Sequence, residues 1–171
     1  MTKEALINYA KNGANDEIYT PDYAIWPLLK YLPKNLTIWE PTDFGASNIT
    51  KVLKKLGYKV ISTHKTNLDF LEEEPDFDYD MIITNPPYSI KDDFLARCYK
   101  LKKPFCLLLP LTALEGVRRG GLFREFGISV IILDRRINFT SNKGNWFNAS
   151  WFVYNVIENN TIIFEKLEEK K

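Results

Sequence analysis

The residues of this sequence with the clearest chemical potential are Asn85-Pro86-Pro87-Tyr88, which directly follow the apolar run Met81 to Ile83. Proline restricts the residue before it to extended geometry and carries no N–H, so Asn85 and Pro86 are both held extended. The tetrapeptide therefore presents two fixed acceptors, the side-chain oxygen of Asn85 and the carbonyl oxygen of Pro86. Two such acceptors suit a ligand group that carries two N–H hydrogens.

An amine attached to an aromatic ring is a poor nucleophile, because its lone pair is delocalised into the ring. Two acceptors that hold its hydrogens favour a pyramidal nitrogen and direct the lone pair at an electrophile, which is catalysis by orientation and preorganised dipoles. Tyr88 adds an aromatic face that can stack on the ring, an interaction worth about 1–3 kcal/mol for a nucleic-acid base. The same four residues could also form an ordinary strand-ending turn with a packed tyrosine.

A site of this kind needs a strand that ends at the tetrapeptide, and the rest of the chain predicts a sheet around that strand. Short apolar runs alternate with longer amphipathic stretches, which favours an α/β sandwich around a mostly parallel sheet. Ligands of open α/β sheets bind at the carboxyl ends of strands, which is where the tetrapeptide falls. Strands are predicted at 36–39, 59–62, 81–83, 105–109, 129–133, 151–157 and 161–164, and helices at 49–56, 92–101 and 114–126.

Both ends of the chain carry further predictions. A helix is expected at 3–10, and Thr20 and Pro21 are expected to begin another that runs toward Leu32 with a kink at Pro27. The last two strands are expected to form an antiparallel hairpin at the sheet edge, turned by residues 158–160. No linker or repeat interrupts the pattern. Residues 1–171 are therefore predicted to form a single domain, with N-terminal helices in 1–34 and a solvated tail at 165–171.

Composition limits the classes of function. The chain has 171 residues, 23 basic and 22 acidic side chains and a formal charge of +1, which excludes a polybasic binder that relies on bulk charge. The apolar runs are far shorter than the ~20 residues of a membrane span and the chain starts with polar residues, so a cytoplasmic protein is expected. Cys98, Cys106 and the lone His64 form neither a disulfide framework nor a zinc site, so no metal is expected.

The tetrapeptide in this context resembles the S-adenosylmethionine-dependent amino-methyltransferases with the signature Asn-Pro-Pro-Tyr, especially the short stand-alone adenine methyltransferases common in phages. The resemblance covers about residues 19–154. It implies the Rossmann-like class I methyltransferase fold, S-adenosylmethionine as cofactor, and the exocyclic amine of adenine in nucleic acid as methyl acceptor, with DNA expected over RNA. Asn85, Pro86, Pro87 and Tyr88 would then form the catalytic set.

Three other segments resemble the family in the expected order and imply a cofactor site. Residues 19–21 resemble the aromatic-Thr-Pro entry to the helix before the first strand, beside the methionine end of the cofactor. Residues 39–45 stand where the family has an acidic residue and a glycine-rich loop, and residues 69–71 resemble an element that binds the cofactor's adenine. The cofactor-binding residues implied in this way are Tyr19, Thr20, Pro21, Glu40, Pro41, Gly45, His64, Asp69 and Phe70.

The resemblance also implies individual roles. Glu40 would face the cofactor's ammonium group, and Asp69 would bind the amino group of its adenine while Phe70 packs on that ring. Two positions depart from the family. The loop after the first strand usually has two glycines, and only Gly45 remains here, which restricts close approach of the backbone. His64 stands where the family usually has a carboxylate for the ribose hydroxyls, so a bond from His64 to the ribose would lack that charge.

The predicted target side lies in a locally basic stretch. Residues 116–143 contain six basic and two acidic side chains, so phosphates could bind there. Arg136 and Phe139 lie where the family contacts an extruded base, and stacking between Tyr88 and Phe139 would offset part of the cost of flipping that base. Core packing of Phe139 and a solvated helix face remain open alternatives. The six basic residues are Arg118, Arg119, Arg124, Arg135, Arg136 and Lys143.

Nucleic acid is therefore the expected partner, and a homodimer or a partner protein could supply target recognition, since no separate recognition domain fits into 171 residues. Two other functions remain open. One is a catalytically inactive protein on the methyltransferase fold that binds a nucleotide, nucleic acid or protein, which the altered loop and the missing ribose carboxylate favour. The other is methylation of a glutamine or small amine, because a planar amide nitrogen needs the same orientation; the basic stretch argues against it.

Overall fold

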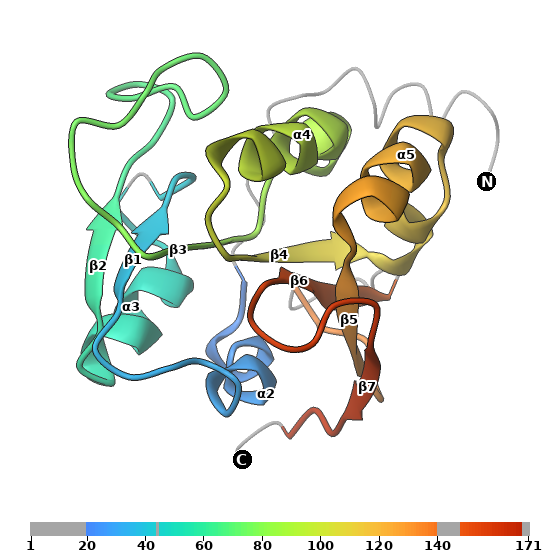
Figure 1. Ribbon diagram of the computed structural model, residues 1–171. Coiled ribbons are helices and arrows are strands. Elements are labelled where there is room, and N and C mark those ends of the chain that lie inside the picture. Colours follow the sequence, from blue (N-terminus) through green and yellow to red (C-terminus); the bar gives the residue numbers. More distant parts are fainter. Residues whose placement is uncertain (1–19, 44, 140–147, 169–171) are drawn as a thin grey trace, which may run out of the picture.

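A seven-stranded sheet is the centre of the computed structural model, which describes residues 20–43, 45–139 and 148–168 (Figure 1). The strands are β1 (Thr37–Glu40), β2 (Lys59–Ser62), β3 (Met81–Thr84), β4 (Phe105–Pro110), β5 (Ser129–Leu133), β6 (Ala149–Tyr154) and β7 (Ile162–Glu165). The α-helices are α2 (Trp26–Leu29), α3 (Asn48–Lys55), α4 (Lys91–Leu101) and α5 (Val117–Phe126), and the 3-10 helices are η1 (Asp22–Ala24), η2 (Tyr88–Ile90) and η3 (Leu111–Leu114).

The strand order is β2-β1-β3-β4-β6-β5-β7, and β6 alone runs antiparallel to its neighbours among these strands. The predicted α/β sandwich with a mostly parallel sheet is thus confirmed. The predicted edge hairpin is wrong, because β6 pairs with β4 and β5 while β7 lies parallel to β5 at the edge. The reason is burial. Residues 149–153 are buried on both faces and need neighbours on both sides, whereas β7 exposes Ile162 and Phe164 as an edge strand can.

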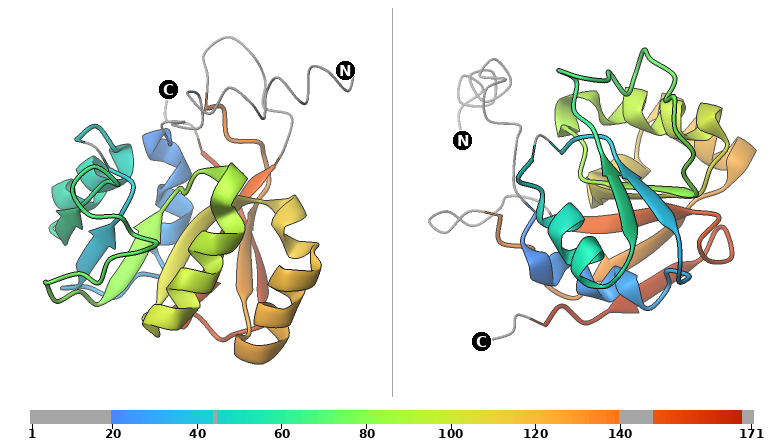
Figure 2. Two further views of the ribbon diagram at one scale, coloured as in Figure 1. Left: turned by 90° about the horizontal axis from the view of Figure 1, so that it is seen from above. Right: turned by 90° about the vertical axis from the view of Figure 1, so that its left-hand side faces the viewer.

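Helices cover both faces of the sheet (Figures 1 and 2). One face packs on α2 and α3 and buries side chains such as Leu28, Leu53 and Ile83; we call this cluster the α2/α3 core. The other face packs on α4 and α5 and buries side chains such as Leu95 and Leu107; we call it the α4/α5 core. The two cores arise because successive residues of a strand point to opposite faces.

Most predicted helices and strands match the structure to within one or two residues at the ends, but the helix from Thr20 to Leu32 is wrong. Two short helices, η1 and α2, replace it, and no side chain caps η1. Pro27 lies in the first turn of α2, where its missing N–H costs no hydrogen bond. The helix predicted at 114–126 is also divided. Gly116 lies between η3 and α5, and its φ of 139° is not compatible with a continuous helix.

The predictions for the N-terminal and C-terminal segments have different outcomes. The helix predicted at 3–10 lies outside the described residues. At the other end, Glu165 belongs to β7 and bonds to Lys30 and Tyr31, and Leu167 is 1% exposed, so the solvated tail does not begin at residue 165 as predicted. No helix within the described ranges has both the length and the apolar character of a membrane span.

Candidate functional site

The carboxyl ends of β1 and β3 lie side by side, and both lead into predicted site residues. β1 ends at Glu40, and β3 ends at Thr84, the residue before Asn85. The two strands are parallel neighbours with Trp39 opposite Ile82. From β1 the chain turns outward to β2 and then returns to the other side of β1 as β3, so the strand order reverses between them. Open α/β sheets bind ligands at such a point.

The motif Asn85-Pro86-Pro87-Tyr88 forms the turn from β3 to the helices that follow. Pro86 is buried, as is the side-chain oxygen of Asn85. Pro87 has a φ of −56° and a ψ of 122°, and it precedes η2, which continues directly into α4. The ring of Tyr88 packs against the α4/α5 core with its hydroxyl group buried. Because the prolines hold the turn rigid, its acceptor oxygens have a defined orientation.

Glu40 is 1% exposed, and neutral groups hydrogen-bond to its carboxylate. The backbone N–H and the hydroxyl of Thr42 donate to Oε1 at 3.0 and 2.9 Å, and the Ser47 hydroxyl donates to Oε2 at 3.2 Å. The Thr42 hydroxyl also lies 2.6 Å from the Thr84 hydroxyl. A chain of hydrogen bonds therefore links Glu40 at the end of β1 to the residue that precedes Asn85.

Burial raises the pKa of Glu40 to about 7, although the hydrogen bonds from Thr84 and Thr42 act in the opposite direction. The nearby Asp43 carboxylate raises the pKa further. An acid whose pKa is higher in the folded than in the unfolded state binds more protons when folded. The free energy of unfolding therefore falls as pH rises from about 4.5 to about 7, by up to about 1.4 kcal/mol for each pH unit.

We expect Glu40→Gln to be more stable than the wild type at pH 8, with the difference shrinking toward pH 4.5. Glutamine keeps an acceptor for Thr42 but carries no charge to bury. Urea unfolding at several pH values measures this difference, and Asp78→Asn on an exposed loop is the matched control. Parallel pH profiles for wild type and Glu40→Gln would contradict the expectation.

Asp43 organises the loop between β1 and α3. Its Oδ1 accepts hydrogen bonds from the backbone N–H groups of residues 45–47 at 2.7–3.0 Å, and its Oδ2 accepts one from the Thr50 hydroxyl at 2.6 Å. Burial acts to raise the pKa of Asp43, but the hydrogen bonds from Thr50 and from the loop outweigh it and hold the pKa below its usual value. The N–H groups that a glycine-rich loop offers to a ligand thus point here at the protein's own carboxylate.

Thr20 and Pro21 lie against the start of α3, close to this loop. The side-chain amide of Asn48 donates a hydrogen bond to the Thr20 carbonyl oxygen at 2.9 Å. Thr20 is 3% exposed, and its hydroxyl is buried without a hydrogen bond to any described residue. Such a hydroxyl is costly unless a ligand or water bonds to it, which fits the predicted place beside a cofactor. Tyr19, predicted to join them, lies outside the described residues, as does Phe44.

The other residues predicted to bind a cofactor at this edge differ in exposure. Pro41 is buried, whereas Gly45 is exposed with a φ of 108°, and a Cβ built there would meet no atom within 4 Å. After β2, the ring Nδ1 of His64 lies 3.1 Å from the Thr66 hydroxyl in an exposed loop. The hydroxyl of Thr63 instead accepts a hydrogen bond from the buried indole of β1 at 2.8 Å. His64 therefore stays the predicted ribose contact after β2.

Comparisons with known proteins show which proteins share this architecture. No protein-family model and no curated protein sequence matches the chain. A Listeria monocytogenes protein assigned to the class I S-adenosylmethionine-dependent methyltransferases is similar in structure, with a TM-score of 0.62 and 13% identity over 97% of this chain and 71% of that chain. The fold is the class I methyltransferase fold.

Two further similar structures are subunits of type I restriction enzymes. The M protein of the EcoKI enzyme has a TM-score of 0.53 and 13% identity over 95% of this chain. A modification subunit from Vibrio vulnificus has a TM-score of 0.52 and 11% identity over 98% of this chain. The chain spans about half the length of these two subunits, 51% in each case.

Asp69 and Phe70 lie between β2 and β3 of this methyltransferase fold. The Asp69 carboxylate accepts a hydrogen bond from the Leu71 N–H at 2.9 Å and so shapes its own turn. Phe70 is 2% exposed, and its ring stacks on Phe94 with centroids 4.8 Å apart and meets Trp39 edge-on. The ring thus packs in the α4/α5 core, and its contact with the cofactor's adenine stays a prediction. Half-buried Asp69 stays the predicted contact for the cofactor's adenine.

The two arginines at the start of α5 are paired with acidic residues of α4. Arg118 contacts the Asp93 carboxylate at 2.6 Å, and Arg119 contacts the Asp92 carboxylate at 2.5 Å. Arg119 also donates a hydrogen bond to the Ala113 carbonyl oxygen at 2.7 Å. Arg119 thus joins η3 and α5 to α4, and its donors are used within the protein. This arrangement replaces the predicted phosphate contact of Arg119 by a structural role.

Arg136 and Phe139, predicted to contact the target, follow β5. Arg136 is exposed, and its Nε donates to the side-chain oxygen of Asn148 at 2.9 Å. Phe139 packs against the α2/α3 core and Tyr88 against the α4/α5 core, so the two rings belong to opposite faces of the sheet. Their clamp on a flipped base stays a prediction. Lys143 and the rest of 140–147 lie outside the described residues.

Four polar residues of this region were missed by the sequence analysis: Thr42, Asp43, Thr84 and Arg97. A local signal existed for Asp43, because an acidic residue shortly before a helix is typical of a cap for the first N–H groups. Thr42 and Thr84 are 42 residues apart and meet through strand pairing, so no local pattern indicates their contact. Arg97 looks like any helix-surface arginine in the sequence.

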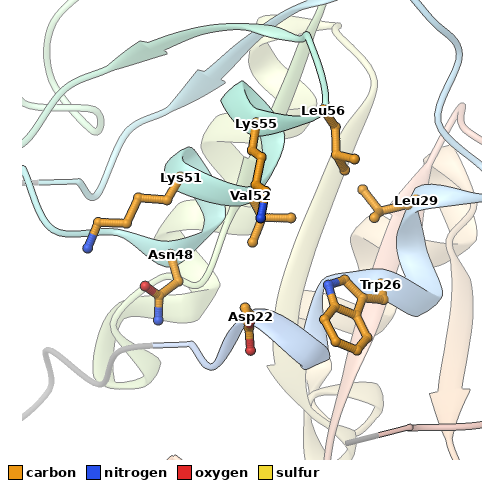
Figure 3. A pocket seen from close by; sticks show the side chains of 8 residues that line it. All are labelled: Asp22, Trp26, Leu29, Asn48, Lys51, Val52, Lys55 and Leu56. Carbon is orange, nitrogen blue, oxygen red and sulfur yellow. The ribbon is translucent and has the colours of Figure 1, made fainter. Parts of the chain in front are cut away.

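A groove of about 620 Å³ lies between α2 and α3 (Figure 3). Apolar side chains from both helices line it, together with Lys51 and Lys55 of α3 (Figure 3). It contains none of the predicted catalytic or cofactor-binding residues and is therefore separate from the candidate site. The residues that line it are Asp22, Trp26, Leu29, Asn48, Lys51, Val52, Lys55 and Leu56.

Proposed function

We propose that the protein transfers a methyl group from S-adenosylmethionine to the exocyclic amine of adenine in nucleic acid, with DNA as the expected substrate. The observation that carries this proposal is the place of Asn85-Pro86-Pro87-Tyr88. The motif follows β3 at the point where the strand order reverses, and hydrogen bonds through Thr42 link Thr84, the residue before it, to the buried carboxylate of Glu40. The methyltransferase fold and the restriction-enzyme subunits among its structural neighbours support the same class of reaction.

The motif residues would act on the amine. The side-chain oxygen of Asn85 and the carbonyl oxygen of Pro86 would accept hydrogen bonds from its two hydrogens and orient the nitrogen lone pair. Tyr88 would stack on the base. The amine loses its proton only after attack, so no general base is needed early. This assignment leaves Asn85 with a role in catalysis and none in cofactor binding.

S-adenosylmethionine would supply an electrophilic methyl group when bound. The residues at the end of β1 fit a cationic ligand, because the Glu40 carboxylate is buried and its hydrogen bonds come from the neutral groups of Thr42 and Ser47. An ammonium group nearby would favour the ionised form of Glu40. The buried Thr20 hydroxyl offers a further polar contact for the same ligand. Together with Gly45, His64 and Asp69, Glu40 and Thr20 are the residues that we expect to hold the cofactor.

The decisive experiment is a methyl-transfer assay with labelled S-adenosylmethionine on double-stranded DNA, single-stranded RNA and a glutamine-containing peptide. We expect label in DNA and, after digestion of the DNA to nucleosides, in N6-methyl-2′-deoxyadenosine. Label in the peptide alone would favour the glutamine methyltransferase. No transfer to any substrate, together with undetectable cofactor binding by calorimetry, would overturn the proposal.

One observation favours the non-catalytic alternative. The N–H groups of residues 45–47 are already bonded to Asp43, so they are not available to a cofactor in this arrangement. A protein that binds a nucleotide, nucleic acid or partner without methyl transfer could tolerate this loop. Calorimetric titration with S-adenosylmethionine separates the two functions, because the enzyme must bind it and the alternative need not.

We expect nucleic-acid binding to depend only modestly on salt. Arg118 and Arg119 are paired with acidic residues of α4. Of the other exposed basic residues of the predicted stretch, Arg135 and Arg136 follow β5 in the segment predicted to contact the target, whereas Arg124 lies on α5. Two neutralised phosphates correspond to a log–log slope of affinity against salt of about −2. Arg136→Gln should reduce the slope by about 1. Titrations between 50 and 300 mM salt, about a sixfold range, measure this slope. A slope near zero for the wild type would show that nucleic acid is not a partner.

A further inference from the structure

Arg97 is a buried arginine in the middle of α4. Its side chain is 5% exposed, and each part of its guanidinium donates a hydrogen bond to the loop between β2 and β3. Nε donates to the Phe70 carbonyl oxygen at 2.9 Å, and NH2 donates to the Glu73 carbonyl oxygen at 2.6 Å. NH1 contacts the Glu74 carboxylate at 2.8 Å. One side chain thus fixes residues 70–74 to α4.

A second contact fastens the same loop to the same helix. The ring of Phe70 stacks on that of Phe94 with centroids 4.8 Å apart and an angle of 22° between the planes. Phe94 and Arg97 are three residues apart on α4, so both lie on one face of that helix. The loop therefore has an apolar and a polar anchor on α4. Its backbone next to Asp69 is held in one orientation.

The loop at residues 70–74 and helix α4, which Arg97 joins, both adjoin residues of the proposed site. Asp69 immediately precedes the anchored Phe70, and α4 follows the motif at residues 85–88 through η2 alone. A shift of the loop relative to α4 would therefore move Asp69 relative to Asn85.

We propose that Arg97 is a positioning residue that holds Asp69 in place for the amino group of the cofactor's adenine. This inference rests on the proposed function. A guanidinium suits the task because its planar set of donors reaches two carbonyl oxygens and a carboxylate at once, which a lysine ammonium on a flexible stem does not reproduce. The carboxylate of Glu74, whose side chain is 69% exposed, balances the positive charge of Arg97 on the side that faces solvent.

The test compares two ligands by calorimetry: S-adenosylhomocysteine and its analogue in which hydrogen replaces the amino group of the adenine ring. A site built to bond a polar group rejects a ligand that lacks it. We expect the wild type to bind S-adenosylhomocysteine at least about tenfold more tightly than the analogue. In Arg97→Lys we expect this preference to fall below about threefold, through weaker binding of S-adenosylhomocysteine. Lys100→Arg, at an exposed lysine of the same helix α4, is the matched control and should keep the wild-type preference.

A merely structural role for Arg97 predicts a different result. Loss of folded protein weakens both ligands equally, so an unchanged preference in Arg97→Lys would overturn the inference. If Arg97→Lys does not fold, Glu74→Gln provides the test, because it keeps the two carbonyl contacts of Arg97 and removes the ion pair. The preference for S-adenosylhomocysteine should then fall by about half. An unchanged preference overturns the inference. Equal wild-type binding of the two ligands would also overturn it, whereas wild-type binding of neither would overturn the proposed function itself.

Discussion

Replacement of Asn85 by alanine is expected to raise the activation free energy of methyl transfer by about 2–4 kcal/mol. The rate should therefore fall roughly 30- to 900-fold. The loss follows from the removal of one of two acceptors that orient the target amine. Cofactor affinity and thermal stability should change little, because the proposed contacts of Asn85 are with the acceptor base. Single-turnover transfer of labelled methyl groups to DNA, with calorimetry for the cofactor, measures both quantities.

Two variants of Asn85 separate the acceptor from the side chain's volume. Asn85→Asp keeps an acceptor oxygen and should retain more activity than Asn85→Leu, which keeps the approximate volume alone. An alanine variant with more than about a tenth of the wild-type rate would show that Asn85 does not orient the amine. Equal activities of the aspartate and leucine variants would lead to the same conclusion.

Replacement of Asp43 by alanine is expected to lower the free energy of unfolding by about 2–3 kcal/mol. The variant leaves three backbone N–H groups and the Thr50 hydroxyl without the acceptor that they share in the structure. For a chain of this length the loss corresponds to roughly 5–10 °C in Tm. Thermal and urea unfolding followed by circular dichroism measure it, and Asp78→Ala on the exposed acidic loop should change little.

The effect of Asp43 has a defined pH dependence. The pKa of Asp43 is lower in the folded than in the unfolded protein. Its ionised carboxylate therefore stabilises the fold above the ordinary aspartate pKa, and this stabilisation is lost as pH falls through the pKa of the folded protein. The gap between wild type and Asp43→Ala should therefore narrow below about pH 4. A constant gap down to pH 2.5, about a unit below the ordinary pKa, would mean that uncharged contacts of Asp43 carry the effect.

Asp43→Ala also tests the cofactor loop. If the N–H groups of residues 45–47 are freed for a ligand, cofactor affinity could rise in spite of lower stability. If Asp43 instead holds the loop in its binding conformation, the affinity falls. Calorimetry on the folded variant at 10 °C distinguishes the two, and a rise would show that Asp43 competes with the cofactor for the loop.

Local chemistry determined much of what could be predicted for this protein. β2 and β5 have the predicted bounds, because short apolar runs with β-branched residues form strands wherever they pair. The turn at residues 85–88 is likewise local, since the two prolines restrict their own dihedral angles and that of Asn85. The acceptor chemistry of the motif and its place after a strand followed from the sequence for this reason.

Tertiary structure decided the strand order, the direction of β6 in the sheet and the partners of the polar residues. Hydrogen bonds between strands join residues far apart in the chain, and their pairing depends on which surfaces are buried in the whole molecule. The same cause explains Phe70, whose ring is in the core, and Arg119, whose partner is 27 residues away. It explains as well why the contact of Thr42 with Thr84, and the contacts of Arg97 with its loop, could be read only from the structure. Their energies arise from burial, and burial is a property of the folded chain and not of a local segment.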